Sequence, residues 1–331
     1  MSSIPDSISI PVDAPRSLPP VAVLAPVAVL LALAAFPLIA TALGFDFYIG
    51  VARRILIFAL AAASLNLILG YGGLVALGHA GFIGVGAYTV VALSEAGVTS
   101  AWLLWPAAAL TAALAAAAIG AVSLRTRGVY FIMITLAFAQ MLYYVFVSLR
   151  SYGGDDGYNI AARPVLGLGL DSGNESTLYW VMLALVVLVL WWFHRAMQSR
   201  FGHALAGIRD NEVRMRALGY PVYRLQVTAF VIVGAAAGLA GALLAANSGF
   251  VSPAAMHWTQ SATLVVMVVI GGLGRRWGGP VGAAIWLALE EILKLQTDYW
   301  HLPLGVLLIV IALWAPRGVS ALLDARKRRS A

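Results

Sequence analysis

Residues 225–248 read LQVTAFVIVGAAAGLAGALLAANS and contain no charged side chain. A helix of about 20 apolar residues crosses the ~30 Å hydrocarbon core of a bilayer. The stretch is continuously apolar, so it lacks the alternation of hydrophobic and polar residues found in outer-membrane barrel strands. It therefore predicts a transmembrane helix.

Similar apolar runs recur through the rest of the chain. They lie near 21–44, 54–70, 74–97, 101–122, 129–149, 178–194, 260–273, 280–297 and 302–316. The composition agrees, because 62% of the residues are hydrophobic and only 11% are charged, whereas soluble domains average about 25% charged residues. We predict an all-α polytopic membrane protein with about eight to ten transmembrane or re-entrant helices.

Two of these runs are candidates for broken or re-entrant segments. The run at 74–97 contains four closely spaced glycines, and the run at 260–273 is short for a full crossing. Interrupted helices occur in membranes where their backbone is buried in protein or lines a cavity. We expect one transmembrane domain over 21–318, a disordered polar tail over 1–20 and a basic tail over 319–331.

Arginine and lysine placement predicts the orientation. The net charge is +7, and we interpret this excess as the cytoplasmic bias of membrane proteins rather than as a sign of nucleic-acid binding. Six arginines lie between Arg195 and Arg224, and five basic residues follow Trp314. We expect both regions, and both termini, to be cytoplasmic.

The same topology makes predictions for the other charged loops. It places Arg125, Arg127, Arg275 and Arg276 inside, and Asp155, Asp156, Asp171 and Glu175 outside. Strict alternation puts Arg53 and Arg54 outside as well. Either a segment before residue 100 does not span, or these two arginines snorkel to the outer interface.

Several catalytic functions are excluded. A P-loop needs a lysine directly after glycine, but the two lysines, Lys294 and Lys327, follow Leu293 and Arg326. The chain contains no HExxH or GxSxG motif, no clustered metal ligands and no cysteine. We predict a non-catalytic chain without a cofactor or metal, so energy for active transport would come from partner chains or an ion gradient.

The basic loop at about 199–224 combines charged and apolar residues. The segment from Ile208 to Gly219 is amphipathic and predicts a short helix that Gly219 and Pro221 end. A solvated surface loop is one interpretation. A docking element that fits a groove of a partner protein is the other.

Four stretches resemble, in order, the branched-chain amino acid ABC permease family, and the match is closer to its LivM type than to the paired LivH type. They are LNLILGYGGLVALGHAGFIGVGAY (65–88), LRTRGVYFIMITLAFAQM (124–141), FGHALAGIRDNEVRMRALGYPVYRLQVTAFVIVGAAAGLAGALLAANSGFVSP (201–253) and VVMVVIGGLGRRWGGPVGA (265–283). The YGGDDG segment (152–157) also matches, although Tyr152 stands where the family often has Thr or Ser.

This resemblance implies a permease subunit of an ATP-driven importer in a bacterial inner membrane. It implies two ATP-binding subunits inside, a second homologous permease subunit, an extracytoplasmic substrate-binding protein and a branched-chain amino-acid substrate. The loop at 199–224 would be the coupling loop that contacts the ATPase subunits. The residues that fall on its family positions are Arg209, Asp210, Asn211, Glu212 and Gly219.

Polar and small residues in the first glycine-rich run suggest a translocation path. The candidates are Asn66, Gly78, His79, Gly84 and Gly86. Glycine breaks can expose backbone dipoles to a zwitterionic substrate, and intramembrane polar residues are often functional. The alternative is structural, because small residues also let helices pack closely in lipid.

Other classes of function are compatible with the same sequence. Glu290 and Lys294 have the i,i+4 spacing of a helical ion pair, but with Glu95 they could also serve an ion-coupled secondary transporter or a channel that works without ATPases. A structural membrane scaffold is a third alternative. Urea and short amides are alternative substrates, since similar permeases carry them.

Overall fold

The structure, a computed structural model, describes residues 20–160, 164–167, 174–296, 299, 301–314 and 318–319. The predicted tails, 1–20 and 319–331, lie outside these residues except for Pro20 and Val319. The helices that build the bundle are α1 (Pro20–Ala42), α2 (Asp46–Asn66), α3 (His79–Glu95), α4 (Ala101–Ser123), α5 (Val129–Ser148), α6 (Glu175–Met197), α9 (Val222–Ser248), α10 (Trp258–Gly271), α11 (Gly278–Lys294) and α12 (His301–Trp314).

Each of the ten apolar runs in the sequence overlaps one of these helices, so the predicted all-α membrane fold is confirmed. Within the described residues, five helices are long and apolar enough to cross a membrane. They are Phe47–Tyr71, Ala101–Ser123, Val129–Ser148, Glu175–Met197 and Val222–Ser248. The shorter helices α3, α10, α11 and α12 have 14 to 17 residues, which at 1.5 Å per residue is less than a ~30 Å core requires.

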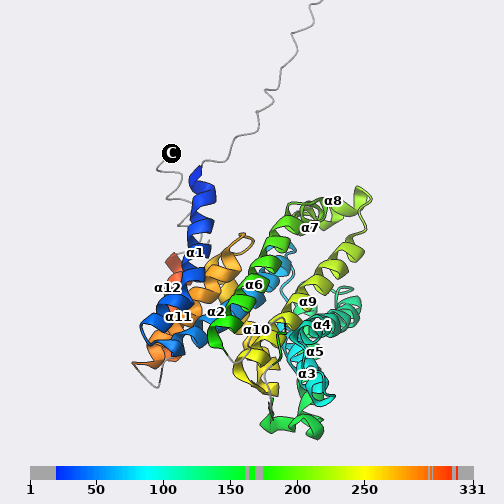
Figure 1. Cartoon of the computed structure of the whole chain (residues 1–331). Coiled ribbons are helices and arrows are strands. Elements are labelled where there is room, and N and C mark those ends of the chain that lie inside the picture. The colour runs from blue at the N-terminus through cyan, green and yellow to red at the C-terminus, as the bar shows by residue number, and fades with distance from the viewer. Residues whose placement is uncertain are drawn as a thin grey trace, which may run out of the picture.

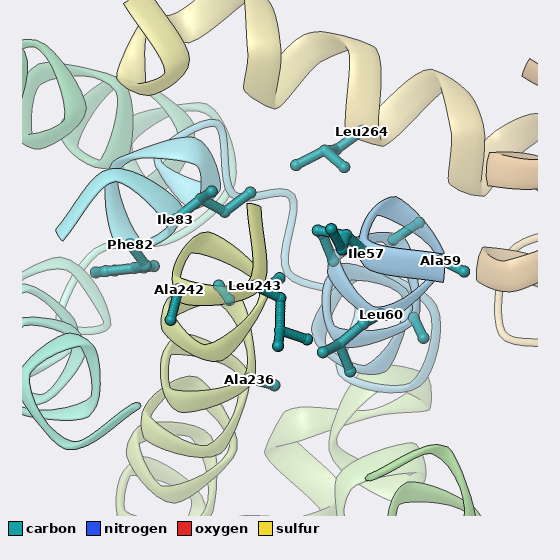
Figure 2. Packing of buried hydrophobic residues seen from close by; sticks show 14 of the residues in the cluster. Ile57, Ala59, Leu60, Phe82, Ile83, Ala236, Ala242, Leu243 and Leu264 are labelled. Atoms are coloured by element: carbon teal, nitrogen blue, oxygen red, sulfur yellow. The ribbon is translucent and has the colours of Figure 1, made fainter. Parts of the chain in front are cut away.

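The core forms around α9, which packs against α2, α3 and α4. Figure 2 shows Leu243 of α9 between Leu60 of α2 and Ile83 of α3, with Leu264 of α10 nearby. Glycines bring these helices unusually close, because a Cβ on Gly86 would collide with the carbonyl oxygen of Gly238. Such close approach supplies the packing that drives helix association in lipid.

The bundle contains two neighbouring interruptions. After α2 the chain forms a π-helical turn, η1 (Leu67–Tyr71), and then runs without helix until α3 starts at His79. The second interruption is the loop 272–277 between α10 and α11. The predicted run at 74–97 is therefore helical only from His79, because its first residues belong to the interruption.

Asn66 joins the two interruptions. Its Oδ1 accepts a hydrogen bond from the backbone N–H of Gly274 at 2.9 Å, and its Nδ2 donates to the carbonyl oxygen of Arg275 at 2.8 Å. The side chain is 3% exposed. One amide thus pairs with both a donor and an acceptor of the second interruption.

The charged segments lie at opposite ends of the molecule. Two short helices, α7 (Arg200–Asp210) and α8 (Glu212–Ala217), lie at one end, and the turn-rich segment after α5 lies at the other (Figure 1). That segment includes the 3₁₀ turns η2 (Arg150–Tyr152) and η3 (Gly154–Asp156) and the strand β1 (Tyr158–Asn159). The strand pairs antiparallel with β2 (Phe250–Val251), which precedes the 3₁₀ turn η4 (Pro253–Met256).

Arg53 and Arg54 lie near the start of α2, and Arg53 contacts the start of α6, whose other end leads into α7. Arg53 is 3% exposed and forms an ion pair with Glu175 at the start of α6. Arg54 contacts Glu290 of α11 at 3.0 Å. Both arginines are thus held by carboxylates far away in the sequence.

Candidate functional site

The predicted coupling loop forms an elbow of two helices, α7 and α8, that meet at Asn211. Leu205 and Ile208 bury the apolar side of α7. The sequence predicted one helix from Ile208 to Gly219, but Asn211 interrupts it with an extended backbone (φ −158°, ψ 97°). Asparagine favours such a break because its side chain can cap the next helix, and here its Oδ1 accepts from the N–H of Arg214 at 2.9 Å.

Gly219 ends the elbow, as the sequence predicted. Its φ is +83°, a left-handed conformation that glycine adopts without steric cost. The N–H of Gly219 donates to the carbonyl of Arg216 at 2.9 Å, and that of Tyr220 donates to Met215 at 3.1 Å. These two bonds form a Schellman motif, which terminates α8 sharply.

The elbow displays both charge signs beside apolar side chains. Glu212 contacts Arg216 at 2.7 Å and also Arg127, in the loop between α4 and α5, at 3.0 Å. Val213 is 73% exposed and Leu218 is 66% exposed. The outward side of α8 is therefore an apolar surface with charged neighbours, the composition of a docking surface.

Arg209 lies on the inward side of the elbow, in contrast to Val213. Its guanidinium donates to the carbonyl oxygen of Gly70 at 2.7 Å and contacts Asp210 at 3.0 Å. Gly70 is in η1, so this bond links the elbow to the first interruption of the bundle. A cavity of about 300 Å³ lies beside the link, between the elbow, the loop after η1 and the loop between α4 and α5; its lining includes Gly72, Leu74, Thr126, Arg127, Asn211 and Gln226.

The second interruption also carries a cation next to this link. Burial lowers the pKa of the Arg276 guanidinium from its ordinary value, and the nearby Tyr71 opposes that shift. The ordinary pKa of arginine is far above neutral, so the guanidinium keeps its charge at neutral pH. The cation also lies over the ring of Trp277, 5.3 Å from the centroid.

The five candidate path residues are packed inside the bundle. His79, which is 1% exposed, lies 2.9 Å from the Oγ of Ser64 through its Nε2. A Cβ on Gly78 would lie 2.6 Å from the carbonyl oxygen of Thr135, and one on Gly84 would collide with Met256. These contacts and those of Asn66 and Gly86 give all five a packing role, while their role in a path stays a prediction.

Sequence reasoning missed Ser261 as a polar partner of this region. Its Oγ accepts from the N–H of Ala80 at 2.9 Å, in the first turn of α3. Ser261 is fully buried in α10. The available signal was a hydroxyl inside an apolar run, but its partner lies 181 residues away in the chain.

The ionisable residues of the ion-coupled alternative do not form a single cluster in the structure. Glu290 is 6% exposed and contacts Lys294 at 2.5 Å as well as Arg54. Glu95 is exposed at the last position of α3. Glu290 therefore serves an ion-pair cluster between α2 and α11, as the i,i+4 spacing to Lys294 predicted in part.

Comparison with known proteins identifies the family. The sequence profile of the family described as "Branched-chain amino acid transport system / permease component" matches residues 47–312. The high-affinity branched-chain amino acid transport system permease proteins LivM of Escherichia coli and Salmonella typhimurium are 31% and 30% identical to this chain, in both cases over 82% of the chain and 69% of the relative.

A second type of permease from the same kind of system is also similar. The LivH permease protein of Salmonella typhimurium is 26% identical over 79% of this chain and 90% of its own length. No solved structure matches the chain at a significant level. The profile match over most of the chain and the LivM identities show that the chain belongs to the family of permease components of branched-chain amino acid transport systems.

Proposed function

We propose that this chain is a permease subunit of an ATP-driven importer for branched-chain amino acids in a bacterial inner membrane. The observation that carries the proposal is the elbow of α7 and α8, which displays Val213 and Leu218 on the end of the bundle that holds the basic loops. Two ATP-binding subunits would dock there. ATP hydrolysis belongs to those partners, because this chain lacks a P-loop lysine.

The remaining partners follow from the family. A second, LivH-like permease would form the other half of the pathway, since a LivH protein is among the relatives. A soluble binding protein would deliver the substrate to the opposite end, where Asp155 and Asp156 are exposed in η3. The branched-chain amino-acid substrate rests on the named transport systems of the two LivM proteins.

Arg209 provides the route from the ATPase side into the bundle. It binds the carbonyl of Gly70, and Asn66, one turn earlier, binds Gly274 and Arg275 of the second interruption. Movement of the elbow would therefore reach both interruptions through two side chains. Asp210 orients the Arg209 guanidinium through a contact to its Nε at 3.1 Å.

The first test is co-purification of the complex from membranes, with partners identified by mass. Glu212→Arg removes the pairs with Arg127 and Arg216 and reverses the charge at the docking surface, so we expect it to release two ATPase subunits. Arg209→Glu should weaken the same assembly by detaching the elbow from Gly70. Asp155→Arg, an equal charge reversal at the opposite end, is the control and should retain them.

Absence of an ATPase from the complex of the unchanged protein would contradict the proposal and favour a transporter that works alone. Substrate identity needs a separate measurement, uptake of leucine by the reconstituted complex with unlabelled competitors. We expect isoleucine and valine to compete. Competition by urea or short amides, without competition by isoleucine, would replace the proposed substrate class.

A further inference from the structure

The helix α5 has little cover within this chain. Only 17% of its membrane-spanning window is buried, against 72% for the corresponding windows of α2 and α9. It packs mainly on α3 and η4, and more lightly on α4 and α10. The uncovered side of α5 and the adjoining side of α10 therefore face lipid, a second subunit or a water-filled path.

Two glutamine side chains on this surface argue against lipid and in favour of a second subunit or a water-filled path. Gln140 of α5 is half-buried and Gln260 of α10 is exposed, and neither side chain makes a hydrogen bond to a described residue. Gln140 lies eleven positions beyond Val129, and Gln260 lies eleven before Gly271. At 1.5 Å per residue both amides are about 16 Å from the elbow end of their helices, close to the middle of a ~30 Å core.

An unpaired amide at that depth is strongly disfavoured against lipid, because the hydrocarbon offers no hydrogen-bond partner. Two contacts show which end of α5 and which end of α10 lies next to the elbow. Arg127 next to α5 pairs with Glu212, and Gly274 next to α10 lies beside Arg209. The two amides are therefore at the same level on neighbouring antiparallel helices.

One turn farther from the elbow, a string of rings crosses the same surface. Ring centroids of Tyr144 and Tyr143 are 5.2 Å apart, those of Tyr143 and His257 are 5.6 Å apart, and those of His257 and Trp258 are 5.9 Å apart. Tyr144 is 66% exposed and Trp258 is 40% exposed. Aromatic faces beside a few polar groups are typical of sites for ligands with an apolar body.

We propose that the surface formed by Gln140, Tyr143, Tyr144, His257 and Gln260 is the wall of the translocation path that contacts the substrate, an inference that rests on the proposed function. The substrate class is a zwitterion with an aliphatic side chain. Its side chain packs on the rings, and the amides, each with an acceptor oxygen and a donor nitrogen, bind its ammonium and carboxylate groups. The second permease closes the path from the other side.

The absence of cysteine from this chain permits a direct test. Gln140→Cys and Gln260→Cys are introduced singly into the complete complex in membrane vesicles and treated with a small, charged, water-soluble thiol reagent. The matched controls are Leu114→Cys on α4 and Leu188→Cys on α6. Both control residues are well exposed, at 62% and 61%, and both are predicted to face lipid at a similar depth.

We expect the cysteines at the two glutamine positions to react at least tenfold faster than the controls. We also expect added leucine to slow the reaction at these two positions. Equal rates at all four positions would overturn the inference, because they would place the surface against lipid or in a dry contact between subunits. Fast labelling without protection, in a complex that takes up leucine, would overturn the substrate contact. Failure of the proposed function has a different signature, in which the unchanged complex takes up no leucine.

Discussion

At the scale of single residues, Asn66 links the end of α2 to the loop 272–277 through two hydrogen bonds. Asn66→Ala would remove the hydrogen bonds to the N–H of Gly274 and to the carbonyl of Arg275, and a lost hydrogen bond typically costs about 0.5–1.5 kcal/mol. We expect a clear fall in the melting temperature of the detergent-solubilised complex, measured by intrinsic fluorescence. Ser199→Ala, which removes only an exposed hydroxyl that donates to the carbonyl of Ala196 at the end of α6, should melt close to the unchanged protein.

A second residue, Glu290, allows a test within one helix. Glu290→Ala would leave Arg54 and Lys294 without their shared carboxylate, and hydrogen bonds to charged groups contribute about 1.5–3 kcal/mol each. Because both cations are more than a third exposed, water screens part of this loss, and we expect about 1–2 kcal/mol in total. Glu291→Ala is the control, and an equal loss of stability in that variant would argue against the cluster.

At the scale of helices, the glycine contacts between α3 and α9 set how closely the elements approach. Gly86→Ala places a methyl group against the carbonyl of Gly238, and overpacking typically costs about 1–3 kcal/mol. We expect a lower melting temperature and less assembled complex, read by size-exclusion chromatography. Gly305→Ala in α12 meets no atom within 4 Å and should be tolerated. Normal assembly of the Gly86 variant would mean that α3 and α9 separate more easily than their packing indicates.

The sequence predicted the existence of the helices better than their connections. Apolar runs identify helices because bilayer insertion depends on local hydrophobicity, and all ten runs became helices. The glycines before His79 indicate an interruption only weakly, because the hydrogen bonds that fix it join Asn66 to residues more than 200 positions later. The break at Asn211 was missed for a local reason, since an asparagine that caps a helix and one that continues a helix read alike.

Assignment of the candidate site was limited in the same way. The family resemblance located the elbow, but not that Arg209 points inward to Gly70 while Val213 points outward. The partners of Arg53 and Arg54 lie 122 and 236 residues away, so their side of the molecule could be predicted only from strict alternation. A sequence pattern does not reveal contacts between residues that are so far apart in the chain.

For the whole molecule, the arrangement of loops predicts the two sides of the membrane. Asp155→Cys in η3 should react with an impermeant maleimide added outside intact cells, because it lies at the end opposite the elbow. Arg214→Cys in α8 should react only after the cells are permeabilised. Reaction of both from outside would contradict the cytoplasmic position of the elbow and, with it, docking of ATPases there.

The hydrogen bonds of Asn66 also set a condition on how the protein is made. Asn66 is synthesised 208 residues before its partner Gly274, a delay of about 10–40 s at the usual rate of 5–20 residues per second. During that time α2 can already be in the membrane with its amide unpaired. The amide of Asn66 is therefore without its final partners for several seconds. We expect the insertion machinery or a neighbouring helix to bind it temporarily, until α10 and α11 are inserted.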